Sequence, residues 1–85
     1  MVRLLVFHMH GCPHCRSVVG PEGLAASLAD VADVYELEAG HQLCGRLGVS
    51  AFPSFAFVAD GGVYGWRRGA PRTYEALSSA ARALA

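Results

Sequence analysis

Two cysteines separated by two residues are the part of this sequence best suited to chemistry. Cys12 and Cys15 enclose Pro13 and His14 in the segment CPHC, directly after an apolar run. Thiols at this spacing can meet within one helical turn, and a thiolate is both a nucleophile and a metal ligand. The segment therefore predicts either a redox-active dithiol or a metal site.

The dithiol is expected where a strand ends and a helix begins. Pro13 suits the first turn of a helix, where its missing N–H is not needed. The positive end of that helix would stabilise the Cys12 thiolate and lower the pKa of this thiol below its usual value of about 8.5. We therefore expect Cys12 to be the exposed nucleophile and Cys15, one turn deeper, to attack a mixed disulfide. His14 can add positive charge or a hydrogen bond to the Cys12 thiolate.

The metal alternative uses the histidines that precede the dithiol. His8, His10 and Cys12 alternate, so their side chains would share one face if the strand continued through them. Together with Cys15 they would give two imidazoles and two thiolates, a tetrahedral set for zinc or copper. All four, however, fall in one short segment, whereas most zinc sites draw ligand pairs from separate segments. The favoured interpretation is that His8 and His10 line the rim of the dithiol and tune its charge or its choice of partner. We keep metal binding as an alternative and expect no metal and no cofactor.

The elements that must position these residues follow from the hydrophobic pattern. The chain is predicted to run β-α-β-α-β-β-α, a parallel βαβ half followed by a hairpin and a closing helix. The predicted sheet is mixed and four-stranded, with the first and third strands central, and three helices flank it. The Gly20-Pro21 pair should interrupt or kink the first helix, and Asp60-Gly61-Gly62 predicts the hairpin turn. The apolar face of the last helix comprises Tyr74, Leu77, Ala81 and Leu84.

Composition limits the possible functions. The chain has 85 residues, 53% of them hydrophobic, and a formal net charge of zero, so one domain over 1–85 is expected, without a basic surface for nucleic acid. No apolar run approaches the ~20 residues of a membrane span. Three cysteines argue against a disulfide-stapled secreted scaffold, and we interpret the apolar start as a strand rather than a signal peptide. These features predict a cytoplasmic monomer.

The whole pattern resembles the thioredoxin superfamily in a minimal form. The N-terminal layout is similar to a glutaredoxin, the segment GVSAFPSFAFVADGGVYGWRRGA is similar to the second half of a thioredoxin, and CPHC is similar to the disulfide-forming DsbA branch. The resemblance implies the thioredoxin fold, with Pro53 in the cis form facing the cysteines and Phe52 pairing with the substrate main chain. Gly69, in the loop after the last strand, matches another docking position of the family. We expect Gly11, Pro13 and Arg68 to contact the substrate as well, although Gly11 replaces a usual aromatic residue and Arg68 a usual apolar one.

The chain departs from the family pattern at several positions. Val6 stands where thioredoxins carry a buried aspartate that helps to move the proton of the second cysteine. Proton transfer at Cys15 must therefore use another group or water. His8, Glu36 and Glu38 are the candidate groups, and the sequence does not choose among them. The paired glycines that glutaredoxins use for glutathione are absent from their expected place, because Gly61-Gly62 fits the hairpin turn. Cys44 is expected to be a small, buried or half-buried thiol.

The predicted function is thiol–disulfide oxidoreduction, with roles in electron transport and cell redox homeostasis. Protein disulfides would be the substrates, and a reductase or glutathione would restore the dithiol. The residues between the cysteines predict a reduction potential between those of thioredoxin and DsbA, roughly −270 to −120 mV. The alternatives are a glutathione-dependent glutaredoxin and the metal-binding module described above.

Overall fold

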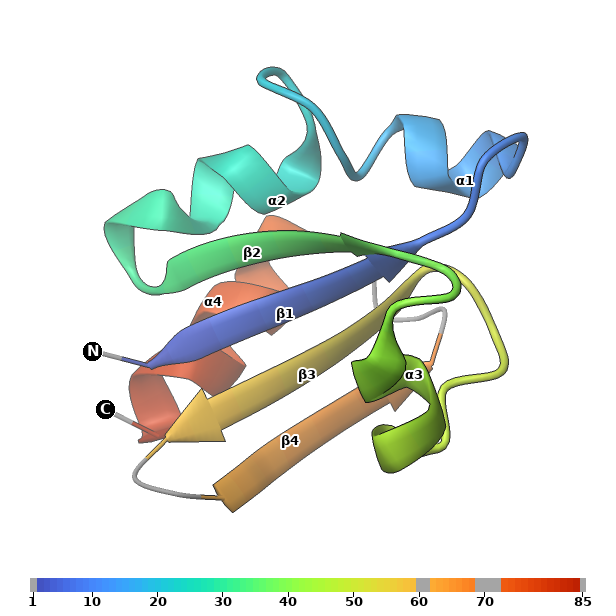
Figure 1. The fold of residues 1–85 in the computed structure, drawn as a ribbon. Coiled ribbons are helices and arrows are strands. Elements are labelled where there is room, and N and C mark those ends of the chain that lie inside the picture. Colours follow the sequence, from blue (N-terminus) through green and yellow to red (C-terminus); the bar gives the residue numbers. More distant parts are fainter. Residues whose placement is uncertain (1, 60–61, 69–72, 85) are drawn as a thin grey trace.

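Strands and short helices alternate along the chain in the computed structural model. It describes residues 2–59, 62–68 and 73–84, with the backbone alone in 62–68. The elements are β1 (Arg3–His8), α1 (Pro13–Arg16), α2 (Leu24–Ser27), the 3₁₀ turn η1 (Leu28–Asp30), β2 (Asp33–Glu38), α3 (Gln42–Leu47), β3 (Ser54–Ala59), β4 (Gly62–Arg68) and α4 (Tyr74–Leu84), shown in Figure 1.

The sheet has the strand order β2-β1-β3-β4, so the first and third strands are central as predicted. β1 pairs with β2 in parallel, whereas the β1–β3 and β3–β4 pairs are antiparallel. The apolar, near-continuous sequence of β1 fits this position, because a central strand is covered on both faces. The predicted hairpin turn at Asp60-Gly61 lies outside the described residues.

The helices differ from the prediction in number. Instead of three helices, the described residues form four α-helices and η1, because the first predicted helix is divided. Gly20 has a φ of 93° and precedes Pro21, a residue that disfavours helical backbone before it. α1 and α2 are therefore separate segments of four residues each. Within the described part of the chain, no helix is long and apolar enough to cross a bilayer.

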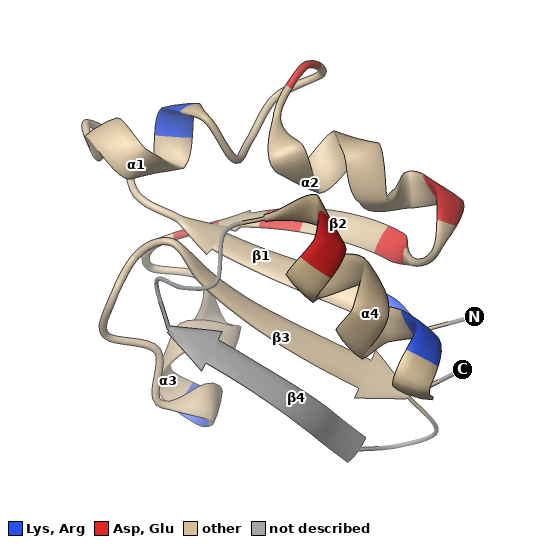
Figure 2. Ribbon diagram, turned by 180° about the vertical axis from the view of Figure 1, so that it is seen from behind, with Lys and Arg blue, Asp and Glu red and all other residues tan. Residues whose placement is uncertain are grey.

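Alternate residues of β1 build two apolar clusters on opposite faces of the sheet. Leu4 and Val6 are fully buried and pack with Leu28 of η1 and Leu77 of α4, and Figure 2 shows α2 and α4 on this side. Phe7 points to the other face, where α3 covers it. Complete burial of each such side chain contributes roughly 1.5–3 kcal/mol, so β1 belongs to both halves of the core.

Substitution of Gly23 tests how closely the start of α2 packs against the chain that follows α1. Gly23, the N-cap residue of α2, is buried, and a Cβ there would collide with the carbonyls of Val18 and Val19. We expect Gly23→Ala to lower the free energy of unfolding by about 1–3 kcal/mol, because backbone atoms must shift. Gly45 in α3 is the matched control: nothing lies within 4 Å of its added Cβ. Gly45→Ala should raise the free energy of unfolding by about 0.5–1 kcal/mol. Urea unfolding measures both, and a Gly23→Ala variant as stable as wild type contradicts the packing described.

A hydrogen bond between Tyr74 and Asp30 predicts a pH dependence of stability. The Tyr74 hydroxyl donates to Asp30 Oδ2 at 2.8 Å, joining α4 to η1. This bond, followed by partial desolvation, raises the pKa of Tyr74 above its ordinary value of about 10. A raised folded-state pKa stabilises the fold fully below pH ~10, and this stabilisation disappears as the pH rises through the folded value.

We therefore expect Tyr74→Phe to be less stable than wild type near neutrality, with the gap closing at alkaline pH. Urea midpoints measured from pH ~8 to ~11 test this, with Tyr74→Phe/Asp30→Asn as the control for the pair. A gap that stays constant across that range contradicts the hydrogen bond.

Candidate active site

The turn after β1 places the two cysteines at the C-terminal end of this central strand. Gly11 has a φ of 80°, and the Cys12 N–H donates to the Met9 carbonyl at 3.2 Å. Cys12 is the N-cap residue of α1 and Pro13 follows at its first turn, as predicted. The Cys15 N–H donates to the Cys12 carbonyl at 3.1 Å. The two cysteines are therefore held within one turn of backbone, and both are thiols.

Cys12 is more exposed than Cys15, as predicted, but both thiols are less exposed than the sequence suggested. Cys12 is 9% exposed and Cys15 is 3% exposed, so the first cysteine is the more accessible one. The prediction of an exposed Cys12 is wrong in degree, because the chain before Pro53 covers it. His14 and Pro13 are exposed between the two thiols.

The helix behind Cys12 is shorter than the sequence suggested. α1 has four residues, which corresponds to a length of about 6 Å. Its negative end therefore lies close to its positive end and offsets part of the field at Cys12. The N–H groups of the first turn remain in place, but the extended helix dipole that the sequence implied is absent from this element.

The residue directly before Pro53 contacts the dithiol. The Phe52–Pro53 peptide bond is cis, and the Cys12 thiol donates to the Phe52 carbonyl at 3.8 Å. Pro53 is buried. The Phe52 ring is half-buried and packs against the cluster of Phe7 and Cys44, so less of it is available to a partner than the sequence suggested.

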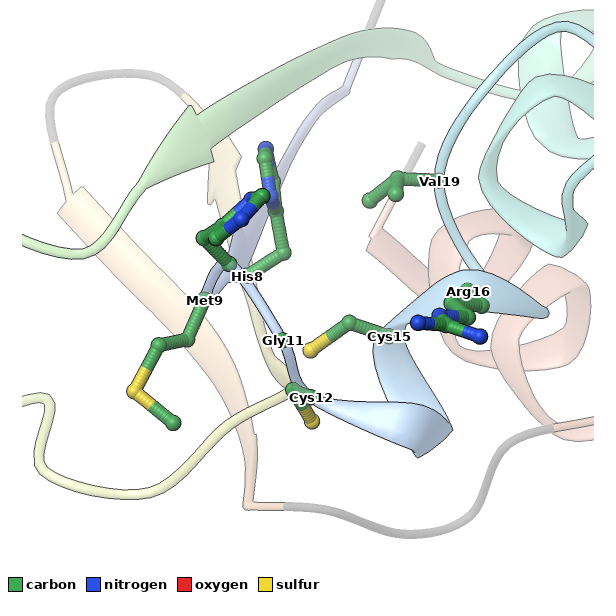
Figure 3. Close-up of a pocket in the computed structure, with 8 residues that line it drawn as sticks. His8, Met9, Gly11, Cys12, Cys15, Arg16 and Val19 are labelled. Carbon is green, nitrogen blue, oxygen red and sulfur yellow. The ribbon is translucent and has the colours of Figure 1, made fainter.

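A pocket of about 240 Å³ opens between the end of β1 and α1. Figure 3 shows Cys15 pointing from α1 toward Gly11 and the end of β1. The predicted residues Gly11, Cys12 and Cys15 contribute to its wall, whereas Pro13 and His14 do not. The wall consists of His8, Met9, His10, Gly11, Cys12, Cys15, Arg16 and Val19.

Several of these wall residues escaped sequence reasoning. Arg16 directly follows the second cysteine, and Val19 lies one helical turn after Cys15. A helix continued from Cys12 would have placed both beside the dithiol, so the spacing carried a signal for them. Met9 carried none, since its side chain is 46% exposed on a turn that the sequence did not define.

The structure does not gather the residues of the metal alternative. β1 ends at His8 and the chain turns at once, so His10 does not continue the alternating face on which the predicted ligand set depended. Among the described residues, no three His, Cys, Asp or Glu side chains are placed to hold one ion. The set His8, His10, Cys12 and Cys15 therefore lines a pocket without forming a tetrahedral site.

The remaining candidate residues lie on β4, β2 and α3. Arg68 ends β4 and pairs through its backbone with Ser54, next to Pro53; its side chain and Gly69 lie outside the described residues. Glu36 Oε2 accepts a hydrogen bond from the Gly20 N–H at 3.0 Å. Cys44 is buried in α3 as predicted and donates to the Glu38 carbonyl at 3.9 Å.

Solved structures of thioredoxins share this arrangement of elements. A thioredoxin from Schistosoma mansoni superimposes with a TM-score of 0.81 at 16% identity, over 99% of this chain and 79% of that one. Thioredoxin from Fasciola hepatica gives 0.80 at 17% identity, over 99% and 81%. Thioredoxin f2, solved with ferredoxin:thioredoxin reductase, gives 0.67 at 20% identity, over 96% and 76%.

The comparisons by sequence found no match. The sequence matches no protein-family model, and no curated protein is similar to it. At these identities the likeness concerns the path of the chain. The protein thus has the thioredoxin fold, and Cys12 and Cys15 lie after its first strand, beside a cis-proline.

Proposed function

We propose that this protein is a thiol–disulfide oxidoreductase that reduces or exchanges protein disulfides through Cys12 and Cys15. The observation that carries the proposal is the contact of the Cys12 thiol with the Phe52 carbonyl at 3.8 Å, with Cys15 one turn behind. The Cys12 thiol thereby lies next to the backbone of Phe52, with which we expect an extended substrate peptide to pair. The fold shared with thioredoxins supports the same assignment.

The proposed cycle has two exchange steps. The Cys12 thiolate attacks a substrate disulfide, a Cys12–substrate bond forms, and the released sulfur takes up a proton. Cys15 then loses its proton and attacks the Cys12 sulfur, which expels the second substrate thiol and closes the Cys12–Cys15 disulfide. The substrate gains a pair of electrons and the dithiol loses it. His14, exposed between the thiols, can add positive charge beside Cys12.

The electron donor is proposed to be a reductase. The similar structure of thioredoxin f2 was solved with ferredoxin:thioredoxin reductase, which gives a precedent for a reductase that docks on this fold. The glutaredoxin alternative is kept, because a dithiol of this kind also exchanges with small thiols. We further propose that the protein works as a monomer in the cytoplasm, where thiols stay reduced.

Trapping experiments test the roles of the two cysteines. Cys15→Ser should accumulate a mixed disulfide with a protein substrate, because the second exchange cannot occur, whereas Cys12→Ser should not. Both variants should reduce insulin at least about 100-fold more slowly than wild type. Mass spectrometry of non-reduced samples identifies the adduct, and Cys44→Ser is the matched control that keeps wild-type activity. Adduct formation by Cys12→Ser instead contradicts the assignment.

A comparison of electron donors tests the proposed partner. We expect an NADPH-dependent flavoprotein reductase to sustain insulin reduction, and glutathione as the only donor to sustain it at least about tenfold less. Equal turnover with glutathione alone supports the glutaredoxin alternative. Stoichiometric zinc in protein purified without chelator, together with no disulfide reduction by either donor, contradicts the oxidoreductase proposal and supports the metal-binding module.

A further inference from the structure

The proposed second exchange step requires a place for the Cys15 proton to go. The thiolate is the nucleophile, and Cys15 is 3% exposed, so bulk water has little access to its sulfur. The strand position that a carboxylate could occupy holds Val6, which is fully buried in the apolar cluster with Leu4 and Phe55. The proton acceptor must therefore come from another part of the site.

His8 and Cys15 line the same pocket, and the alternation of β1 accounts for the place of His8. Side chains two residues apart on a strand share a face, so His8 continues the face of Leu4 and Val6, the one that Val18 also covers. His8 is the last residue of β1 and is half-buried. Its side chain and that of Cys15 line the same pocket, as Figure 3 shows.

The other ionisable groups nearby are less well placed. Glu36 Oε2 accepts the Gly20 N–H at 3.0 Å and lies outside the pocket wall. Glu38 is paired with His8 in the parallel register but does not line the pocket. The guanidinium of Arg16 is a hydrogen-bond donor without an acceptor atom. His10 lines the pocket from the exposed turn, beyond the strand that fixes His8.

We propose that His8 accepts the proton of Cys15 through water in this pocket during the second exchange step, an inference that rests on the proposed oxidoreductase function. A pocket of about 240 Å³ has room for several water molecules. The neutral imidazole takes a proton as the Cys15 sulfur attacks Cys12, and the Cys12–substrate bond breaks. The proton returns to solvent or to the leaving thiolate, so atoms and charge balance.

A coloured disulfide reagent separates the two exchange steps. In a Cys44→Ala background, equimolar dithiobis(nitrobenzoate) should release one coloured thiolate when Cys12 attacks and a second when Cys15 resolves the adduct. We expect His8→Asn and His8→Gln to leave the first phase unchanged. The second phase should slow by about tenfold or more, part of the usual 10²–10⁴-fold value of general base catalysis.

Matched variants distinguish His8 from its neighbours. His10→Asn and Glu38→Gln should both resolve the adduct at the wild-type rate. A slow second phase in Glu38→Gln with a normal one in His8→Asn assigns the proton to Glu38 and overturns the proposal. Thermal unfolding of each variant, together with its unchanged first phase, shows that the fold is retained.

The pH profile and chemical rescue separate proton transfer from a structural effect. In wild type the second phase should level off once the imidazole is neutral, whereas in His8→Asn it should keep rising until the Cys15 thiol itself ionises. Added imidazole should restore the rate of His8→Ala in proportion to its concentration. The titratable or charged groups around His8 are His10, Cys12, Cys15 and Arg16 in the pocket and Glu36 and Glu38 on β2.

The two hypotheses fail in different ways. If the wild-type protein shows no second phase and does not reduce insulin, the oxidoreductase function is wrong. If wild type does both but the His8 variants match it in rate and pH profile, or imidazole gives no rescue, only the role of His8 is wrong.

Discussion

The site depends on the antiparallel pairing of β1 with β3. Phe7 is registered opposite Ser54, so the chain that leaves β1 and the chain that enters β3 lie side by side at the same end of the sheet. The first segment continues into Cys12 and the second consists of Phe52 and Pro53. The contact of 3.8 Å between thiol and carbonyl is therefore a consequence of strand register. A slip of one residue would turn the buried side chains of β1 to the wrong faces, which makes the register costly to change.

A set of backbone hydrogen bonds fixes the short helix that carries the dithiol. Val18 and Val19 both donate to the Cys15 carbonyl, and the Ala25 N–H donates to the Val18 carbonyl at 2.9 Å. The Gly20 N–H is bonded to a carboxylate of β2. These bonds attach the residues that follow α1 to α2, and they attach Gly20 to the sheet. The position of the thiols thus depends on the hydrogen-bonded segment between α1 and α2 more than on α1 itself. A helix of four residues is too short to be stable alone.

Features that follow from the hydrophobic periodicity were predicted from the sequence. Features that depend on contacts between distant segments were not. The strand order, the face of the last helix and the location of Cys12 and Cys15 all follow from local patterns. The division of the first helix was visible in Gly20-Pro21, but its extent depends on bonds to β2 that no local pattern encodes. The cis form of Pro53 came from the family resemblance, because local sequence favours trans.

Residues 6 and 8 of β1 show how a small domain can combine a core with proton transfer. A domain of this size buries a modest share of its surface, so each core position matters. Val6 contributes roughly 1.5–3 kcal/mol when buried, whereas a carboxylate there would incur a desolvation cost of several kcal/mol. His8 lies on the same face two residues further on, where the strand meets a pocket and the side chain stays half-buried. An ionisable group at the rim of the core avoids the cost of one inside it, and it lines the same pocket as the sulfur from which the proton must leave.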